Sequence, residues 1–235
     1  MAKGKLFLLP TTLGPSSPEA VIPAAVLSKS RKLKLFIAEN ERTARRYLKS
    51  IGTEWPLNDL QFSVLDKHTA PEVWKPFIQP LLDGTDMGLL SEAGLPAIAD
   101  PGSVIVSLCH EKGIEVVPCS GPSSIILGLI ASGFNGQSFI FHGYLPIDAR
   151  DRVKALRQME AENRKSGITQ IFMETPFRNP KLYEQIIENC SPQTLLCIAT
   201  DITLDTEQIH TKPLSDWKRK PPSLNKRPCI FLIGQ

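Results

Sequence analysis

The chain has 235 residues, of which 42% are hydrophobic and 22% are charged, and its formal net charge is +3. These ordinary globular values argue against disorder, a collagen-like repeat or a coiled coil. The small positive charge permits a polyanionic partner without indicating one, because dedicated nucleic-acid-binding proteins usually carry a clear basic excess.

The first half of the chain alternates short apolar runs with amphipathic stretches. Strands are expected at residues 6–10, 33–38, 61–66, 87–91 and 114–118. Helices, each long enough to cross over a sheet and return parallel, are expected at 18–28, 40–51, 71–82 and 104–112. Nearly continuous apolar strands indicate burial on both faces of the sheet. This half therefore predicts an α/β domain.

The second half is richer in strands and less regular. Helices are expected at 122–132, 150–165 and 178–189, and strands at 138–142, 169–173, 194–201, 207–211 and 229–233. We therefore predict two α/β domains of similar size, with a boundary that separates residues 1–118 from residues 119–235.

The sequence predicts no targeting segment, no disulfide framework and no cysteine metal site. The N-terminal apolar run of four residues is shorter than the core of a signal peptide, which has about 7–15 residues. No stretch approaches the ~20 apolar residues of a membrane-spanning helix. The five cysteines form no CxxC pair, so we expect reduced core thiols, with neither a metal site nor a disulfide framework. We expect a cytoplasmic protein without a membrane partner.

The most informative loop spans residues 91–102, SEAGLPAIADPG, between a predicted strand and a helix that begins near Ser103. In an open α/β sheet, this strand-to-helix corner is where ligands bind. Its two glycines allow the backbone to approach a ligand closely, and its two prolines fix the direction of the chain. A plain connection with tight turns explains the same composition, so both interpretations stay open.

Two further loops follow predicted strands. Residues 118–124, PCSGPSS, precede a helix whose N-terminus would favour an anion, although helix capping alone explains the serines. In the second half, Glu174 ends a buried strand and is placed to accept hydrogen bonds from a ligand. The alternative is that Glu174 forms an ordinary ion pair with Arg178, which would contribute little to stability.

Several familiar motifs are absent from the sequence. It contains no GxGxxG after the first strand, no GxxxxGK[ST], no HExxH and no GxSxG. A dinucleotide fingerprint, a P-loop, a zinc protease motif and a nucleophile elbow are therefore not predicted.

Four segments in order resemble the tetrapyrrole (corrin/porphyrin) methylase superfamily, and most closely the ribosomal RNA small subunit methyltransferase I branch. The branch motif SDAGTPxISDPG corresponds to SEAGLPAIADPG at 91–102, and PGPSA corresponds to SGPSS at 120–124. FxGFLP corresponds to FHGYLP at 141–146, and FYESPHR corresponds to FMETPFR at 172–178. The four motifs lie between residues 91 and 178.

The resemblance implies a two-domain tetrapyrrole-methylase-like α/β fold, with a mostly parallel N-terminal sheet, flanking helices and a mixed sheet in the C-terminal domain. It implies S-adenosylmethionine as the cofactor, held between the domains, and a homodimer. It also implies transfer of a methyl group to a ribose 2′-hydroxyl of 16S ribosomal RNA, with no DNA partner. The positions that match the cofactor site of the family are Pro10, Ala93, Gly94, Leu95, Ile98, Ser123, Ser124, Glu174, Asp201 and Ile202.

The sequence departs from the family pattern mainly on the substrate side. The family's EDTRxT reads ENERTA at 39–44, its ELTK reads DITL at 201–204, and its first-loop Asp is Glu92. A tetrapyrrole or other small-metabolite methylase, or a catalytically silent relative that binds ligand, therefore stays as an alternative.

A hydroxyl acceptor needs a general base, because a neutral alcohol is a poor nucleophile. Our candidates are Glu39, Glu41 and Glu92, each of which could equally be a solvated acid or a partner of Arg42. For an RNA acceptor, the clusters at 31–34, 42–46, 218–220 and 226–227 are candidates for phosphate contact, and ordinary solvated helix surfaces are the alternative.

Overall fold

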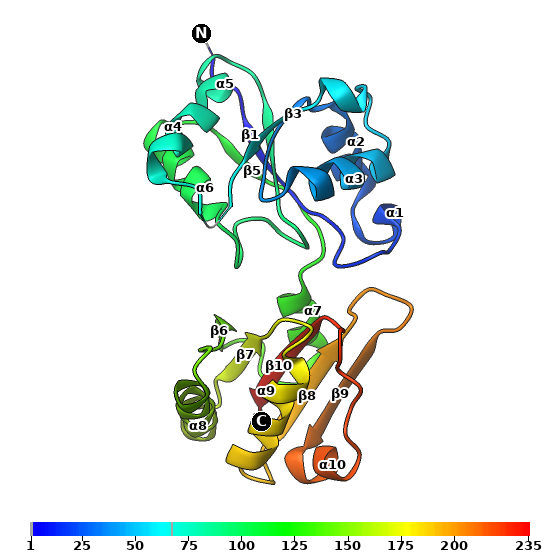
Figure 1. Ribbon diagram of the computed structural model, residues 1–235, viewed down its shortest axis with the longest axis vertical. Helices are drawn as coiled ribbons and strands as arrows, with labels where there is room; N and C mark the ends of the chain where they lie inside the picture. The colour runs from blue at the N-terminus through cyan, green and yellow to red at the C-terminus, as the bar shows by residue number, and fades with distance from the viewer. Residues whose placement is uncertain (1, 67) are drawn as a thin grey trace. The chain divides into compact units, whose positions relative to one another are not determined.

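A computed structural model describes residues 2–66 and 68–235 of the chain. It divides into two compact units, Met1–Ser123 and Ser124–Gln235, each built from strands and helices (Figure 1). The α/β class predicted from the sequence is confirmed in both units. The sequence places the domain boundary after residue 118, and this boundary stays a prediction.

The first unit contains a five-stranded sheet in the order β3-β2-β4-β1-β5, and every neighbouring pair is parallel. Its strands are β1 (Leu6–Leu9), β2 (Leu35–Ala38), β3 (Gln61–Val64), β4 (Met87–Leu90) and β5 (Val116–Pro118). Its α-helices are α1 (Pro18–Val21), α2 (Ala24–Lys32), α3 (Glu41–Ile51), α4 (Trp74–Phe77), α5 (Gln79–Leu82) and α6 (Ser103–Glu111). Two short 3-10 helices, Leu57–Asp59 and Pro71–Val73, lie in the connections.

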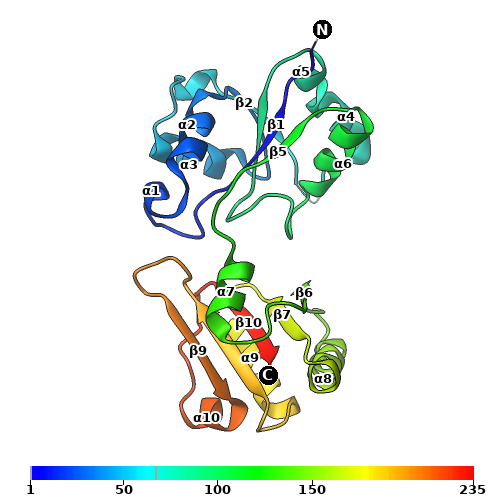
Figure 2. The same ribbon diagram turned by 180° about the vertical axis from the view of Figure 1, so that it is seen from behind.

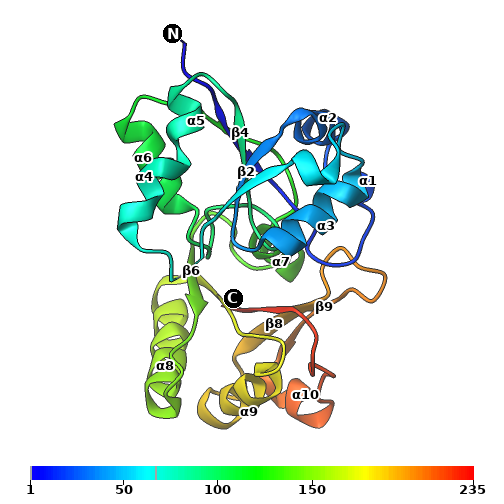
Figure 3. The ribbon, with the colours of Figure 1, turned by 45° about the horizontal axis from the view of Figure 1, so that its top comes forward.

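Helices cover both faces of this sheet. Each strand sends alternate side chains to the two faces, so both faces contribute to a hydrophobic cluster. Phe7 and Leu9 of β1 pack in one hydrophobic cluster with α1, α2 and α3, whereas Leu6 packs in a second cluster with α5 and α6. Figures 1 and 3 show α2 and α3 on one side of the sheet and α4 and α6 on the other. Burial on both faces explains why these strands have nearly continuous apolar sequences.

Proline divides two of the helices that the sequence predicts as continuous. The stretch expected at 18–28 forms α1 and α2, and Pro23 is the residue that precedes α2. The stretch expected at 71–82 forms a 3-10 turn followed by the short helices α4 and α5. Proline lacks a backbone N–H and clashes with the preceding turn, so it favours breaks at these positions.

The second unit contains a mixed five-stranded sheet in the order β6-β7-β10-β8-β9, as the resemblance implied. Its strands are β6 (Phe139–Tyr144), β7 (Thr169–Met173), β8 (Leu195–Thr200), β9 (Gln208–Pro213) and β10 (Cys229–Gly234). Its helices are α7 (Ser124–Ser132), α8 (Ala149–Ser166), α9 (Asn179–Asn189) and α10 (Leu214–Arg219), of which the sequence did not predict α10.

The two faces of the second sheet are also covered by helices. Residues of α8, α9 and α10 share one hydrophobic cluster with Phe172 of β7 and Phe231 of β10, whose rings stack with centroids 5.8 Å apart. On the opposite face, a methyl group added to Gly128 of α7 would lie 3.5 Å from Ile230 of β10. Accordingly, α9 lies in front of β10 in Figure 1, and α7 lies in front of it when the view is reversed (Figure 2).

Strand directions determine which loops of the second unit emerge together. β10 pairs antiparallel with both β7 and β8, so β7 and β8 run in the same direction and end at the same edge of the sheet. The segment that leads into β10 starts from this edge as well. Glu174, Asp201 and Arg227 are therefore brought to one end of the second unit.

The described part of the chain offers neither a membrane-spanning helix nor a metal-binding cluster. None of its helices is both long and apolar enough to cross a membrane. Among residues 2–66 and 68–235, no group of three or more His, Cys, Asp or Glu side chains is arranged to hold a metal ion. All five cysteines are free thiols, and four of them are buried.

Candidate active site

Three loops of the first unit leave the sheet side by side. β1 lies between β4 and β5 and is parallel to both, so the loops that begin at Pro10, Ser91 and Cys119 all emerge at the carboxyl edge. The sequence predicts the loops that begin at Ser91 and Cys119 as ligand-binding loops, whereas the resemblance to the family implies a role for Pro10. The edge of a parallel sheet is a general position for ligand binding in α/β proteins.

Backbone hydrogen bonds join the first two loops. The N–H of Thr11 donates to the carbonyl oxygen of Gly94 over 2.9 Å, and the Thr11 hydroxyl donates to the carbonyl oxygen of Ser91 over 3.4 Å. Thr11 is 4% exposed, so this connection is shielded from water. Tyr47 of α3 supports the same loop, since its hydroxyl donates to the carbonyl oxygen of Pro10 over 2.9 Å.

Two glycines allow the third loop to approach the others. A Cβ added to Gly121 would lie 2.2 Å from the Cβ of Pro10, which is far inside van der Waals contact. A Cβ added to Gly94 would lie 3.2 Å from the carbonyl oxygen of Pro122, and Gly94 also has a φ of +75°. Gly121 leaves room for Pro10 because it has no Cβ, and Gly94 in addition adopts a positive φ that favours glycine. These two residues therefore allow the three loops to form one compact corner.

Asp100 organises the loop between β4 and α6. Its carboxylate accepts hydrogen bonds from the N–H of Gly102 over 2.7 Å and from the N–H of Ala97 over 3.0 Å. Ala97 and Ala99 have φ values of 66° and 61°, in a left-handed region that costs free energy for residues with a side chain. Burial raises the pKa of Asp100, and the two N–H donors oppose that rise.

The predicted cofactor residues of this unit differ in exposure. Pro10 and Gly94 are buried where the loops meet, and Leu95 is half-buried. Ala93 is exposed, and the apolar side chain of Ile98 is 45% exposed. The side chains of Ala93 and Ile98 are therefore accessible at this corner, whose loops are joined mainly by backbone contacts.

Two of the three predicted general bases follow strands of the same sheet. Glu39 directly follows β2, and β2 pairs with β4, so Glu39 and Glu92 follow neighbouring strand ends. Glu92 accepts a hydrogen bond from the hydroxyl of Thr43 in α3. Glu41 is ion-paired with Arg45 of the same helix, with 2.7 Å between Oε1 and Nη2.

In the second unit, Glu174 is buried and already has partners. Its side chain is 1% exposed and lies 2.6 Å from the guanidinium of Arg178. The same oxygen, Oε1, accepts the N–H of Thr175 over 2.6 Å. The ion pair considered from the sequence is therefore present, but the carboxylate is buried, unlike that of an ordinary surface pair.

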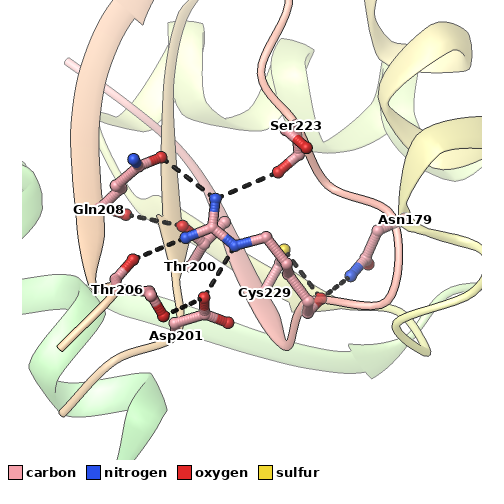
Figure 4. Close-up of polar contacts among 8 residues, drawn as sticks. Asn179, Thr200, Asp201, Thr206, Gln208, Ser223 and Cys229 are labelled. Carbon is pink, nitrogen blue, oxygen red and sulfur yellow. Dashed lines mark hydrogen bonds and ion pairs between the residues drawn. The ribbon is translucent and has the colours of Figure 1, made fainter. Parts of the chain in front are cut away.

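Asp201, the other predicted carboxylate, belongs to a network around Arg227 (Figure 4). Arg227 Nε donates to Asp201 Oδ2 over 2.8 Å, and its Nη2 donates to the carbonyl oxygen of Thr206 over 2.7 Å. Its Nη1 donates to Gln208 Oε1 and to the carbonyl oxygen of Ser223, each over 3.2 Å. One guanidinium thus ties the loop between β8 and β9 to the segment that precedes β10.

The residues after Asp201 include an unsatisfied polar atom. Asp201 and Thr203 have φ values of 51° and 71°, and Ile202 between them is buried. The hydroxyl oxygen of Thr203 is buried and has no hydrogen-bond partner among the described residues. Buried polar atoms are usually paired, so this oxygen is available to a ligand.

Sequence reasoning missed Thr11, Asp100 and Arg227 as organising residues. Asp100 lies inside the loop that the sequence singled out, and an Asp followed by Pro-Gly is a recognisable turn signal. Arg227 was assigned only to a basic cluster, because no local pattern connects it with a carboxylate 26 residues earlier in the chain.

Comparisons with known proteins identify the family. No family model matches the chain. The chain is 29% identical over 235 residues to ribosomal RNA small subunit methyltransferase I of Escherichia coli O157:H7, with 99% of this chain and 78% of the relative covered. It is 30% identical over 237 residues to the protein of the same name from Pseudomonas aeruginosa, with 100% and 80% covered.

Solved structures show the same fold. The crystal structure of the methyltransferase CobJ aligns with a TM-score of 0.64 and 16% identity, over 99% of this chain and 94% of that one. Uroporphyrin-III-C-methyltransferase from Thermus thermophilus aligns with a TM-score of 0.57, also at 16% identity and with the same coverage. The resemblance inferred from the four motifs is confirmed: the chain belongs to the ribosomal RNA small subunit methyltransferase I family.

Proposed function

We propose that this chain transfers a methyl group from S-adenosylmethionine to a ribose 2′-hydroxyl of small-subunit ribosomal RNA. Membership in the family supports the reaction class, and the relatives' name supports the RNA substrate. The structural observation that carries the proposal is the corner formed by three interlocked loops at the carboxyl ends of β1, β4 and β5.

The residues of the corner fit an adenosylmethionine molecule. That molecule combines an apolar nucleoside face with polar groups that exchange hydrogen bonds with backbone. Ile98 offers an exposed apolar side chain, and the unpartnered hydroxyl of Thr203 offers a hydrogen-bonding group in the second unit. We propose that the cofactor is bound by Pro10, Ala93, Gly94, Leu95, Ile98, Ser123, Ser124, Glu174, Asp201 and Ile202.

The protein's own part in the reaction would be alignment and proton removal. When bound, S-adenosylmethionine supplies a methyl group already activated by a sulfonium. Fixed loops reduce the entropy lost on aligning donor and acceptor, which is worth several orders of magnitude in rate. A carboxylate of Glu39, Glu41 or Glu92 would take the hydroxyl proton, a step that typically contributes about 10²–10⁴-fold.

Calorimetric titration with S-adenosylmethionine tests the binding half of the proposal. We expect a micromolar dissociation constant, which corresponds to about 8 kcal/mol. No heat of binding at millimolar cofactor would contradict the proposal. Binding without transfer to any acceptor would indicate a silent relative.

Tritium transfer from labelled cofactor tests the acceptor. Unmethylated small ribosomal subunits should become labelled, and a porphyrinoid in the same buffer should not. Label in the porphyrinoid alone would favour a small-metabolite methylase. In single-turnover reactions, Glu→Gln at residues 39, 41 and 92 together should slow transfer at least 10²-fold. The matched control is Glu54→Gln, since Glu54 is an exposed carboxylate of the same unit.

Three further expectations belong to this proposal. They are a homodimer, a cytoplasmic location where ribosomal subunits are present, and folding domains of residues 1–118 and 119–235 that both contribute to cofactor binding. Sedimentation of the purified protein tests the dimer, and expression of the two segments separately tests the boundary.

A further inference from the structure

The turn between β7 and α9 carries an unusually exposed aromatic side chain. Phe177 is 73% exposed, compared with 54% for Tyr144 and 39% for Phe139 in the same unit. A single exposed apolar residue is ordinary in a soluble protein and needs no partner. What distinguishes Phe177 is how firmly its turn is held and which charges surround it.

The turn is fixed by bonds on both sides of Phe177. On the N-terminal side, the buried carboxylate of Glu174 accepts the N–H of Thr175 and pairs with Arg178, both over 2.6 Å. Arg178 Nε also donates to the Thr175 hydroxyl over 3.2 Å. The backbone that presents the aromatic ring is therefore clamped, so the ring can bind a partner with little loss of backbone entropy.

A second segment is bonded to this turn. The N–H of Lys226 donates to the carbonyl oxygen of Pro176 over 3.1 Å. The side-chain amide of Asn179 donates to the carbonyl oxygen of Arg227 over 2.7 Å (Figure 4). The loop before β10 therefore lies against the turn that carries Phe177.

The two segments that meet at Phe177 are basic. Residues 175–181 and 224–228 contain four basic residues and no acidic residue. Two of the four, Arg178 and Arg227, are paired with carboxylates. The other two, Lys181 and Lys226, are exposed and form no ion pair within the part of the chain that the structure describes.

An exposed aromatic ring beside unpaired lysines matches the chemistry of single-stranded nucleic acid. Bases stack on aromatic faces while cations contact the phosphates, and sequence-specific RNA recognition mostly uses such unpaired nucleotides. An apolar protein partner would match the ring but leave the lysines unpaired. Charge complementarity therefore favours RNA as the partner of this surface.

We infer that Phe177 stacks on an unpaired base of the RNA substrate and that Lys181 and Lys226 contact its backbone. The inference rests on the proposed function, because it takes RNA as the substrate. It adds an RNA-binding surface on the second unit, outside the residues proposed for the cofactor. The family motif FYESPHR has a histidine at the position of Phe177, so an aromatic ring is retained there.

Fluorescence anisotropy with a labelled single-stranded oligoadenylate tests the stacking. Phe177→Ala should weaken binding about tenfold, which corresponds to about 1.4 kcal/mol and lies within the range for one stacked base. Phe177→Trp should bind at least as tightly as the natural chain, and Phe177→Leu should weaken binding as Ala does. Ile147→Ala is the matched control, because Ile147 is an apolar residue of the same unit that is 78% exposed.

The contribution of the lysines should appear in the salt dependence of RNA affinity. Lys→Gln at 181 and 226 together should reduce the slope of log affinity against log salt by about 0.7 for each phosphate that is no longer neutralised. Lys154→Gln with Lys165→Gln, two exposed positions on α8, should leave the slope unchanged. An equal change of this slope in the test variant and in the α8 control would contradict the proposed lysine contacts.

Other outcomes separate this inference from the proposed function. Cofactor titration and transfer to small subunits with the natural chain test the proposed function alone. The inference is wrong if the natural chain does not bind oligoadenylate, or if Phe177→Ala binds it as the Ile147→Ala control does. It is also wrong if Phe177→Ala changes the sedimenting mass and leaves RNA affinity unchanged, because Phe177 would then be a subunit contact.

Discussion

The loops at the strand ends of the two units are held by different forces. In the first unit, backbone hydrogen bonds and close approach at glycine and proline join the loops, as at Thr11 and Gly121. In the second unit, buried carboxylates bind arginines: Glu174 with Arg178 fixes one turn, and Asp201 with Arg227 joins two segments. A corner held by backbone contacts should tolerate changes of exposed side chains, but not an added atom where two backbones touch. An edge held by ion pairs should tolerate changes in the volume of neighbouring side chains, but not the loss of one charged residue of a pair.

Removal of Arg227 should have the largest effect. Arg227→Met keeps a similar side-chain length but leaves the buried carboxylate of Asp201 without its guanidinium. Breaking a buried pair in this way costs about 3 kcal/mol or more, because the remaining charge stays desolvated. Urea unfolding followed by the fluorescence of Trp217, a buried residue of the second unit, measures the loss.

The control is Arg219→Met, since the pair between Arg219 and Asp216 is exposed and exposed pairs contribute about 0–1 kcal/mol. If Arg227→Met and Arg219→Met lower stability equally, buried ion pairs do not hold the second unit's loops. The double variant with Asp201→Asn should recover part of the loss, because it removes the unpaired charge as well.

An added methyl group should have the next largest effect, this time in the first unit. Gly121→Ala places a Cβ 2.2 Å from the Cβ of Pro10, and neither residue can rotate away. Overpacking of this kind costs about 1–3 kcal/mol. It should also weaken binding of S-adenosylmethionine, because the third loop must move away from the first.

Calorimetric melting and cofactor titration check this prediction against Gly136→Ala. A Cβ added at Gly136 meets no atom within 4 Å, so that variant should stay within about 0.5 kcal/mol of the natural chain. Equal melting temperatures for the two variants would show that the first and third loops are not in close contact.

The difference between the two units, backbone contacts in the first and ion pairs in the second, also explains which features the sequence could predict. Gly94 and Gly121, with their neighbouring prolines, mark two loops of the first corner by residue type, so these two were found without a structure, whereas the loop after Pro10 was not. The α/β class followed from the spacing of apolar runs, whereas the breaks before α2 and between α4 and α5 required the local effect of proline to outweigh amphipathic spacing. The pairing of Asp201 with Arg227 depends on the order of β7, β10 and β8, and no local pattern encodes that order.

The smallest effect should come from the titration of Asp100, which combines both kinds of contact. Burial raises its pKa above the ordinary value of 3.8, so the folded state holds this proton more tightly than the unfolded state does. Stability conferred by the natural residue should therefore fall as the pH rises from about 3.8 to the raised pKa, and then level off. Asp100→Asn lacks this titration and keeps an oxygen that can accept the N–H of Gly102.

Melting temperatures of the natural chain and Asp100→Asn, measured across the acid range, provide the comparison. The natural chain should lose stability relative to the variant as the pH rises through this window. Asp59→Asn, on an exposed turn, corrects for the loss of one negative charge. A relative gain in stability with rising pH would mean that the N–H bonds from Ala97 and Gly102 outweigh burial. The loop after β4 would then depend on charge as the second unit does, and the contrast between the two units would not extend to this loop.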